Sequence, residues 1–210
     1  MLKATIVALA PGTAPALAYD DTWYRSNGWG GEYPNGFTMT ADTAIEIRAD
    51  ADPASTAGIA CLLNRDATYH QWNQPRVEKD KLEFVTFSKI EAYRLKKNFT
   101  ADAQPNDGSK DVKLRFRKGD QWEFLTYIGE GFFLMRYRGA VYQAGQDLVE
   151  ASNPLGASDV HQVDEWLNLA CANGATGWLL FADTEDKPGF GPPNITDYGN
   201  AADGQPAAEQ

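Results

Sequence analysis

The chain has 210 residues, 43% of them apolar and 23% charged, so it is long enough for one large or two small domains and too apolar to be disordered throughout. Its 29 Asp and Glu outnumber its 19 Lys and Arg, which gives a net charge of −10. A charge of this sign repels polyanions, so nucleic acid and anionic membrane surfaces are not expected partners. The 19 Gly and 11 Pro are spread between many short segments, which favours an all-β protein with many turns.

Residues 1–18 have the organisation of a signal peptide. Lys3 supplies a positive charge, Ala4–Ala18 is apolar and rich in alanine, and Ala16-Leu17-Ala18 is a small-residue cleavage site. Cleavage there would release a chain that begins at Tyr19 into the periplasm or the medium. The alternative is an ordinary apolar strand or a disordered leader, because proline and glycine interrupt the apolar run. No later run approaches the roughly 20 apolar residues of a membrane span.

Residues 19–41 are rich in glycine and aromatic side chains, with turn signals at Asn27-Gly28 and Asn35-Gly36. They are predicted to form an extended arm that packs its aromatic rings on the domain or presents them to a partner. Two strands are predicted next, at Thr43–Arg48, where apolar and polar residues alternate, and at Ile59–Leu63.

The middle of the chain predicts a series of further strands. Lys81–Phe99 begins with alternation, and its aromatic and β-branched residues favour strand over helix in its second half. Asp102–Lys110 is predicted to be an exposed loop. Three more strands separated by glycine-containing turns are predicted at Val112–Phe116, Gln121–Tyr127 and Phe132–Arg138.

Glu165–Phe181 predicts a β-hairpin, since Asn173-Gly174 is a strong two-residue turn signal between alternating segments. Alternation decides which way its two tryptophans face. With Leu167 and Leu169 on the core side, Trp166 is predicted to lie at the surface and Trp178 in the core. The segment 183–210 is rich in Pro, Gly and Ala and is predicted to be a flexible tail.

Several of these segments resemble the bacterial Src-homology-three-like (SH3-like) barrels. The hairpin resembles the closing W-x-x-V strand, N-G turn and G-W-V strand of that family, and Phe132–Leu148 repeats its pattern. Phe116–Leu125, F-R-K-G-D-Q-W-E-F-L, resembles the family's L-x-K-G-x-x-V-x-V-L, and Ile45–Arg48 resembles its opening strand more weakly. The resemblance implies an all-β fold of two small SH3-like barrels.

Two layouts of these barrels remain open. In the nested layout, 42–75 and 160–182 form one barrel and 82–150 forms a second barrel inserted into it. In the sequential layout, two incomplete barrels follow one another. The two cysteines, Cys61 and Cys171, are an even number in a chain that carries an export signal, which predicts one disulfide. The alternative is two buried free thiols.

The resemblance implies a binding module without catalysis, whose ligand is a peptide, a peptidoglycan fragment or a partner protein. Surface aromatic side chains form the groove in peptide-binding barrels of this architecture. The candidate binding residues are therefore the aromatic side chains Trp166, Tyr69, Trp72, Tyr137 and Tyr142.

Catalytic signatures are not found in the sequence, and no cofactor or metal site is predicted from its motifs. One alternative is a hydrolase in which His161 acts as a base with Asp164 or Glu165. Another is a structural subunit of an envelope complex, in which the aromatic arm docks on a neighbouring protein.

Overall fold

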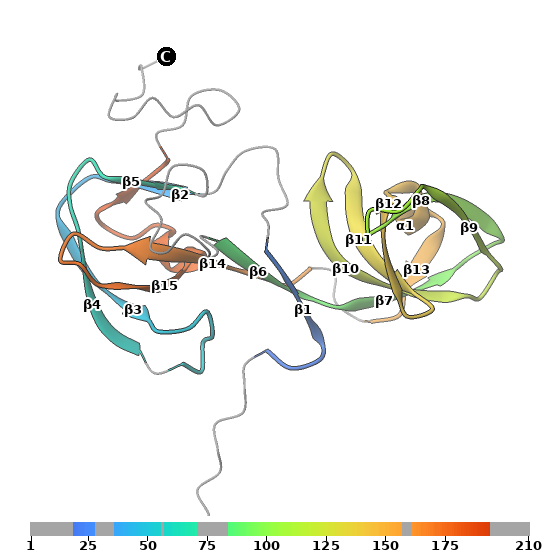
Figure 1. The fold of residues 1–210 in the computed structure, drawn as a ribbon, viewed down its shortest axis with the longest axis horizontal. Helices are drawn as coiled ribbons and strands as arrows, with labels where there is room; N and C mark the ends of the chain where they lie inside the picture. The colour runs from blue at the N-terminus through green and yellow to red at the C-terminus, as the bar shows by residue number, and fades with distance from the viewer. Residues whose placement is uncertain (1–18, 28–35, 56, 71–83, 157–160, 194–210) are drawn as a thin grey trace, which may run out of the picture.

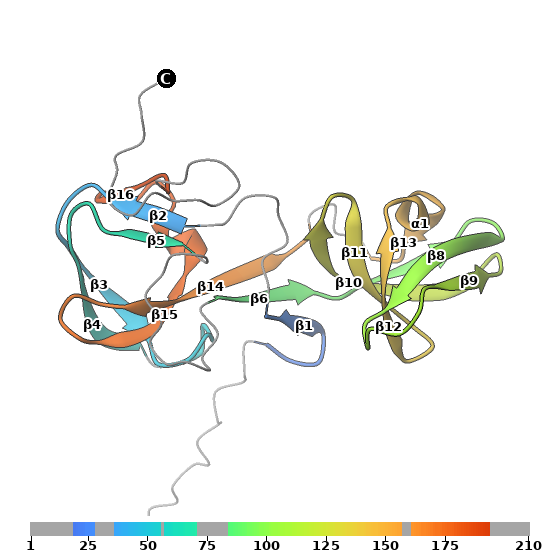
Figure 2. The same ribbon diagram turned by 45° about the horizontal axis from the view of Figure 1, so that its top comes forward.

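The computed structural model describes residues 19–27, 36–55, 57–70, 84–156 and 161–193. These residues form three antiparallel sheets with one short α-helix among them, so the fold is all-β as predicted. Figures 1 and 2 show two lobes, with β6 and β14 running between them and β1 lying across this connection. No helix in the described part of the chain is long and apolar enough to cross a membrane.

The first lobe is built on a six-stranded sheet. Its order is β1 (Trp23–Ser26), β6 (Phe84–Lys89), β14 (Val163–Ala170), β15 (Thr176–Leu180), β3 (Thr43–Arg48) and β4 (Ala57–Leu63). The predicted hairpin is confirmed as β14–β15, with Leu167 opposite Leu179. At Gly177, β15 approaches β3 so closely that a Cβ would lie 2.5 Å from the carbonyl oxygen of Arg48. Glycine is therefore required where the hairpin joins β3.

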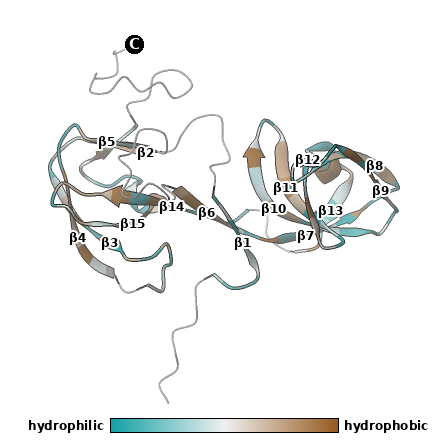
Figure 3. Ribbon diagram, viewed as in Figure 1, coloured by the Kyte–Doolittle hydropathy of each residue, from teal (hydrophilic) through white to brown (hydrophobic). Residues whose placement is uncertain are grey.

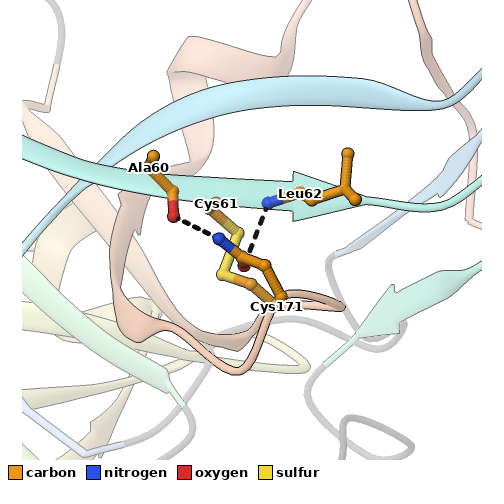
Figure 4. Close-up of a disulfide and its surroundings, with 5 residues drawn as sticks. Ala60, Cys61, Leu62 and Cys171 are labelled. Carbon is orange, nitrogen blue, oxygen red and sulfur yellow. Dashed lines mark hydrogen bonds between the residues drawn. A yellow bond between two sulfur atoms is a disulfide. The ribbon is translucent and has the colours of Figure 1, made fainter.

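The predicted disulfide between Cys61 and Cys171 is confirmed, with the two Cα atoms 5.3 Å apart (Figure 4). It joins β4, at the edge of the six-stranded sheet, to the end of β14. The Asn173 side chain adds to this connection by donating to the Ala60 carbonyl (2.9 Å) and accepting from the Leu62 N–H (3.3 Å). The disulfide and these hydrogen bonds together hold β4 against the hairpin turn.

A three-stranded sheet packs on the same lobe, in the order β16 (Phe190–Gly191), β2 (Gly36–Met39) and β5 (Thr68–His70). Of the two alternatives for the segment 19–41, its described residues pack on the domain: β1 pairs with β6 in the six-stranded sheet, and β2 pairs with β5 in this one. The three-stranded sheet also corrects the prediction of a flexible tail from residue 183. The predicted tail contributes β16, whose Phe190 ring lies 4.9 Å from that of Phe37. Burial of aromatic rings against this core holds both segments in place.

The second lobe is a seven-stranded sheet that curls into a half-barrel. Its order is β13 (Ser152–Pro154), β7 (Glu91–Leu95), β10 (Gln121–Gly129), β11 (Phe132–Tyr137), β12 (Ala140–Gly145), β8 (Phe99–Pro105) and β9 (Val112–Phe116). Figure 3 shows hydrophobic residues on β10 and β11, whose Trp122, Phe133 and Met135 lie in the core of this lobe. The short helix α1 (Asp147–Glu150), which the sequence patterns did not predict, adds the fully buried Leu148.

The sheets divide the segment 82–150 differently from the prediction. β6 pairs with β14 and β1, in the first lobe, and the second lobe begins at β7. Residues 43–63 and 163–180 share one sheet, while 91–154 form the other. Alternation could not assign β6, because Phe84, Val85 and Thr86 are all buried and the strand is covered on both faces.

Candidate functional site

Trp166 is buried, with 1% of its surface exposed, so its predicted surface position is wrong. Its Nε1–H donates to the Tyr19 hydroxyl, which donates in turn to Asp164 (2.8 Å for each bond). The Tyr19 ring also stacks on Phe87 at 3.8 Å. These contacts cover the face of β14 that alternation had assigned to solvent. Trp178, predicted to be in the core, is only partly buried.

The other candidate aromatic residues lie far apart in the fold. Tyr69 is 6% exposed and packs against Phe37 in the core of the first lobe. Tyr137 is 7% exposed, and its hydroxyl donates to Asp120 (2.9 Å) in the second lobe. Trp72 lies outside the described residues. Tyr142, on β12, lines an open groove.

This groove, of about 590 Å³, lies at one end of the half-barrel, and we call it the mouth groove. Its apolar lining comes from three adjacent strands, β8, β9 and β12, and comprises Pro105, Val112, Leu114, Ala140, Val141 and Tyr142. Its polar lining comes from the loop between β8 and β9, through Asn106, Asp107 and Ser109. An apolar surface with a few polar groups at its rim is typical of a ligand site, and barrel mouths are common places for one.

Strand register explains why these side chains meet. Tyr142 lies opposite Pro105 in the β12–β8 pair, and the Asn106 N–H donates to the Val141 carbonyl (3.0 Å). Val112 and Leu114 are two residues apart on β9, so they face the same side of the sheet. Leu114 and Tyr142 also pack against the core of the lobe, so the groove is an open extension of that core. Among the described strands β9 pairs only with β8, which makes it an edge strand.

The sequence patterns missed most of this site. Asp102–Lys110 was predicted to be a plain exposed loop, yet β8 extends to Pro105 and the loop after it forms one wall of the groove. The alternation of Val112, Leu114 and Phe116 was the signal that could have found the other wall. Phe116 is buried, whereas Val112 is 36% exposed, so the apolar face of β9 runs out of the core into the groove.

The rim of the mouth groove is acidic at Asp107. Its carboxylate accepts a hydrogen bond from the Ser109 N–H (2.9 Å), which holds the pKa of Asp107 below its usual value. The loop is therefore turned back on itself, and it carries a negative charge at neutral pH. This charge disfavours an anionic group at that side of the groove.

His161 takes a different partner from the two that the sequence suggested. Its Nδ1 lies 2.8 Å from Glu91 Oε1, whereas Asp164 accepts from Tyr19. Its Nε2 is buried and has no hydrogen-bond partner in the described structure. A general base needs the reacting group within hydrogen-bond reach, and these contacts supply none. The described residues also contain no group of three or more His, Cys, Asp or Glu arranged for a metal ion.

Glu91 also accepts a hydrogen bond from Tyr93 (3.1 Å), and burial together with the Glu91 charge raises the pKa of Tyr93 to about 12. An unfolded tyrosine ionises near pH 10, so the unfolded state loses this proton first. We therefore expect the stability that Tyr93 contributes to be complete below pH 10 and to be lost as the pH rises toward 12.

The ultraviolet absorbance of tyrosinate measures this titration directly. Tyr93→Phe should remove one tyrosine from those that ionise near pH 12. Glu91→Gln should move the same step toward lower pH, because it removes the neighbouring charge. A difference in absorbance between the parent and Tyr93→Phe that is already complete near pH 10 would contradict the assignment.

Comparison with known protein families, with curated proteins and with solved structures finds no match to this chain.

Proposed function

We propose that this protein is a non-catalytic binding module of the cell envelope or the medium, and that it holds an extended peptide segment in the mouth groove. The peptide belongs to a cell-wall component or to a partner protein. The proposal includes export by the signal peptide 1–18 and kinship with the SH3-like barrels. The Cys61–Cys171 disulfide supports the compartment, since such bonds persist outside reducing cytoplasm.

The mouth groove is the observation that carries the proposal. It offers a partly buried aromatic ring, Tyr142, beside the apolar side chains Val112 and Leu114. An apolar side chain of a ligand can be buried there, and the edge of β9 can pair with an extended backbone. The lining includes Ser109 and Asp107, and the Asp107 carboxylate is bonded back to the Ser109 N–H. Its residues include no histidine, lysine or cysteine that could activate a nucleophile, which fits binding better than hydrolysis.

Tyr142→Ala tests the proposal. We expect the variant to fold and to bind at least about tenfold more weakly, since central aromatic residues dominate the energy of such interfaces. The probes are purified peptidoglycan and an array of immobilised peptides that each present one apolar residue, and the readout is the dissociation constant for the best-bound probe.

Tyr127→Ala is the matched control, because Tyr127 is an exposed tyrosine of the same sheet that does not line the groove. It should bind as the parent does. Equal affinities of the parent and Tyr142→Ala, or equal losses in the two variants, would refute the mouth groove as the site.

A further inference from the structure

Five exposed cations gather in three turns of the second lobe, and we call them the basic turn cluster. Lys96 and Lys97 lie between β7 and β8, Arg117 and Lys118 between β9 and β10, and Arg138 between β11 and β12. Of these, the four on the first two turns form no ion pair within the part of the chain that the structure describes. The cluster is therefore a concentration of positive charge, which the nearby Asp120 carboxylate offsets only in part through its interaction with Arg117 and Arg138.

Hydrogen bonds hold the three turns together. The Lys118 N–H donates to the Asn98 side chain (2.8 Å), which joins the first turn to the second. Asp120 accepts from the Arg117 N–H (3.0 Å) and from the Tyr137 hydroxyl (2.9 Å), which joins the second turn to the strand before the third. Both bonds go to the Oδ2 atom of Asp120, and together with the charges of Arg138 and Arg117 they hold its pKa low. The cations are thus set on a fixed backbone frame.

The cluster stands out against the charge of the whole chain. Residues 91–154 carry ten Lys and Arg against nine Asp and Glu, while the rest of the chain carries nine against twenty. Five like charges held close together repel one another and gain from a bound counter-charge. We infer that the basic turn cluster binds a linear polyanion whose backbone carries phosphate groups. A chain with a net charge of −10 thus carries a local site of positive charge.

The residues around the cluster favour a linear phosphate polymer over a membrane surface or a nucleic acid. The exposed large apolar side chains of the described residues lie outside these three turns, so the cluster lacks the apolar anchors of a membrane-bound surface. The aromatic residues next to these turns are Phe99, Phe116 and Tyr137. Phe116 and Tyr137 are buried, Tyr137 beneath Arg138, whose guanidinium carbon lies 4.8 Å from the ring centre, and Phe99 packs partly buried against the core. The cluster therefore offers no fully exposed ring on which a nucleobase could stack.

A linear chain can also touch one end of the protein while the acidic lobe stays away from it, which a flat anionic surface does not allow. Phosphates in a polymer backbone present their oxygens without ordering a side chain, and arginine binds them through two parallel hydrogen bonds. An acidic peptide presents its charges on flexible side chains, which must be ordered on binding.

Calorimetric titration of the full chain with inorganic polyphosphate tests the inference. Raising the salt from about 50 to about 200 mM should weaken binding by about 50-fold if four phosphates are contacted. The variant Lys97→Glu/Lys118→Glu/Arg138→Glu, with one reversal in each turn, should lose binding.

The control is Lys110→Glu/Lys113→Glu/Lys187→Glu, which changes the net charge equally at exposed sites outside the cluster. It should keep the parent's affinity to within a few-fold, and both variants should melt near the parent's temperature. Equal losses in the two variants, no binding by the parent, or tighter binding to poly-glutamate or to anionic vesicles would each overturn the inference.

Discussion

Replacing both Cys61 and Cys171 with alanine is expected to lower the free energy of unfolding by about 4–5 kcal/mol. The bond closes a loop with a sequence separation of 110, and the chain-entropy model assigns about 4.7 kcal/mol to a loop of roughly 100 residues. This loss is comparable with the whole stability of many domains. It should appear as a large drop in the denaturant midpoint.

The second lobe modifies this expectation, because it lies inside the loop. The Leu155 N–H donates to the Ala92 carbonyl (2.8 Å), so the two ends of this lobe are held together while it is folded. If it stays folded when the first lobe unfolds, the effective loop shortens to about 47 residues and the same model gives about 4 kcal/mol. The loss of stability should therefore appear in the unfolding transition of the first lobe.

A reducing agent supplies the control for the disulfide. It should destabilise the parent to the level of the double alanine variant and leave that variant unchanged. A loss below about 1 kcal/mol would mean that the bond constrains the unfolded chain far less than the model requires.

Trp166→Ala is expected to cost about 3–5 kcal/mol of folding stability, the range for truncating a large buried aromatic side chain. The ring is almost fully buried, and its removal would also leave the Tyr19 hydroxyl without the Trp166 N–H. Denaturant unfolding followed by circular dichroism measures this loss.

Trp178→Ala is the matched variant from the other strand of the same hairpin. Trp178 is partly exposed, so its loss should lie nearer 1 kcal/mol, the usual cost of a substitution. If Trp178→Ala were the more costly of the two, the orientation of the hairpin would be wrong. A ligand affinity measured on Trp166→Ala reports mainly on folding, so Tyr142→Ala is the better test of binding.

β14 shows why alternation assigned the two tryptophans to the wrong sides. Alternation identifies a buried face only when the other face is open to water. On β14 the consecutive residues from Trp166 to Leu169 are all buried, because Tyr19 and Phe87 cover the second face. Those covering residues come from distant parts of the chain, and the local pattern carries no record of them.

The candidate site depended on the same kind of distant contact. Of the five aromatic residues selected from the sequence, Tyr69 and Tyr137 belong to cores, and Tyr142 reaches the mouth groove. All three are tyrosines that lie in strands, so the sequence could not distinguish them. Tyr142 reaches the groove because β12 pairs with β8 and because the sheet curls.

The sequence by itself determined the all-β class, the β14–β15 hairpin and the cysteine pair, because turn chemistry, strand alternation and the even cysteine count can be found without knowing the fold. The tertiary structure alone decided that β6 joins the first lobe, that Trp166 is buried, and that three basic turns meet. Each of these depends on which strands become neighbours. That choice is made by packing between residues far apart in the chain, which no local pattern records.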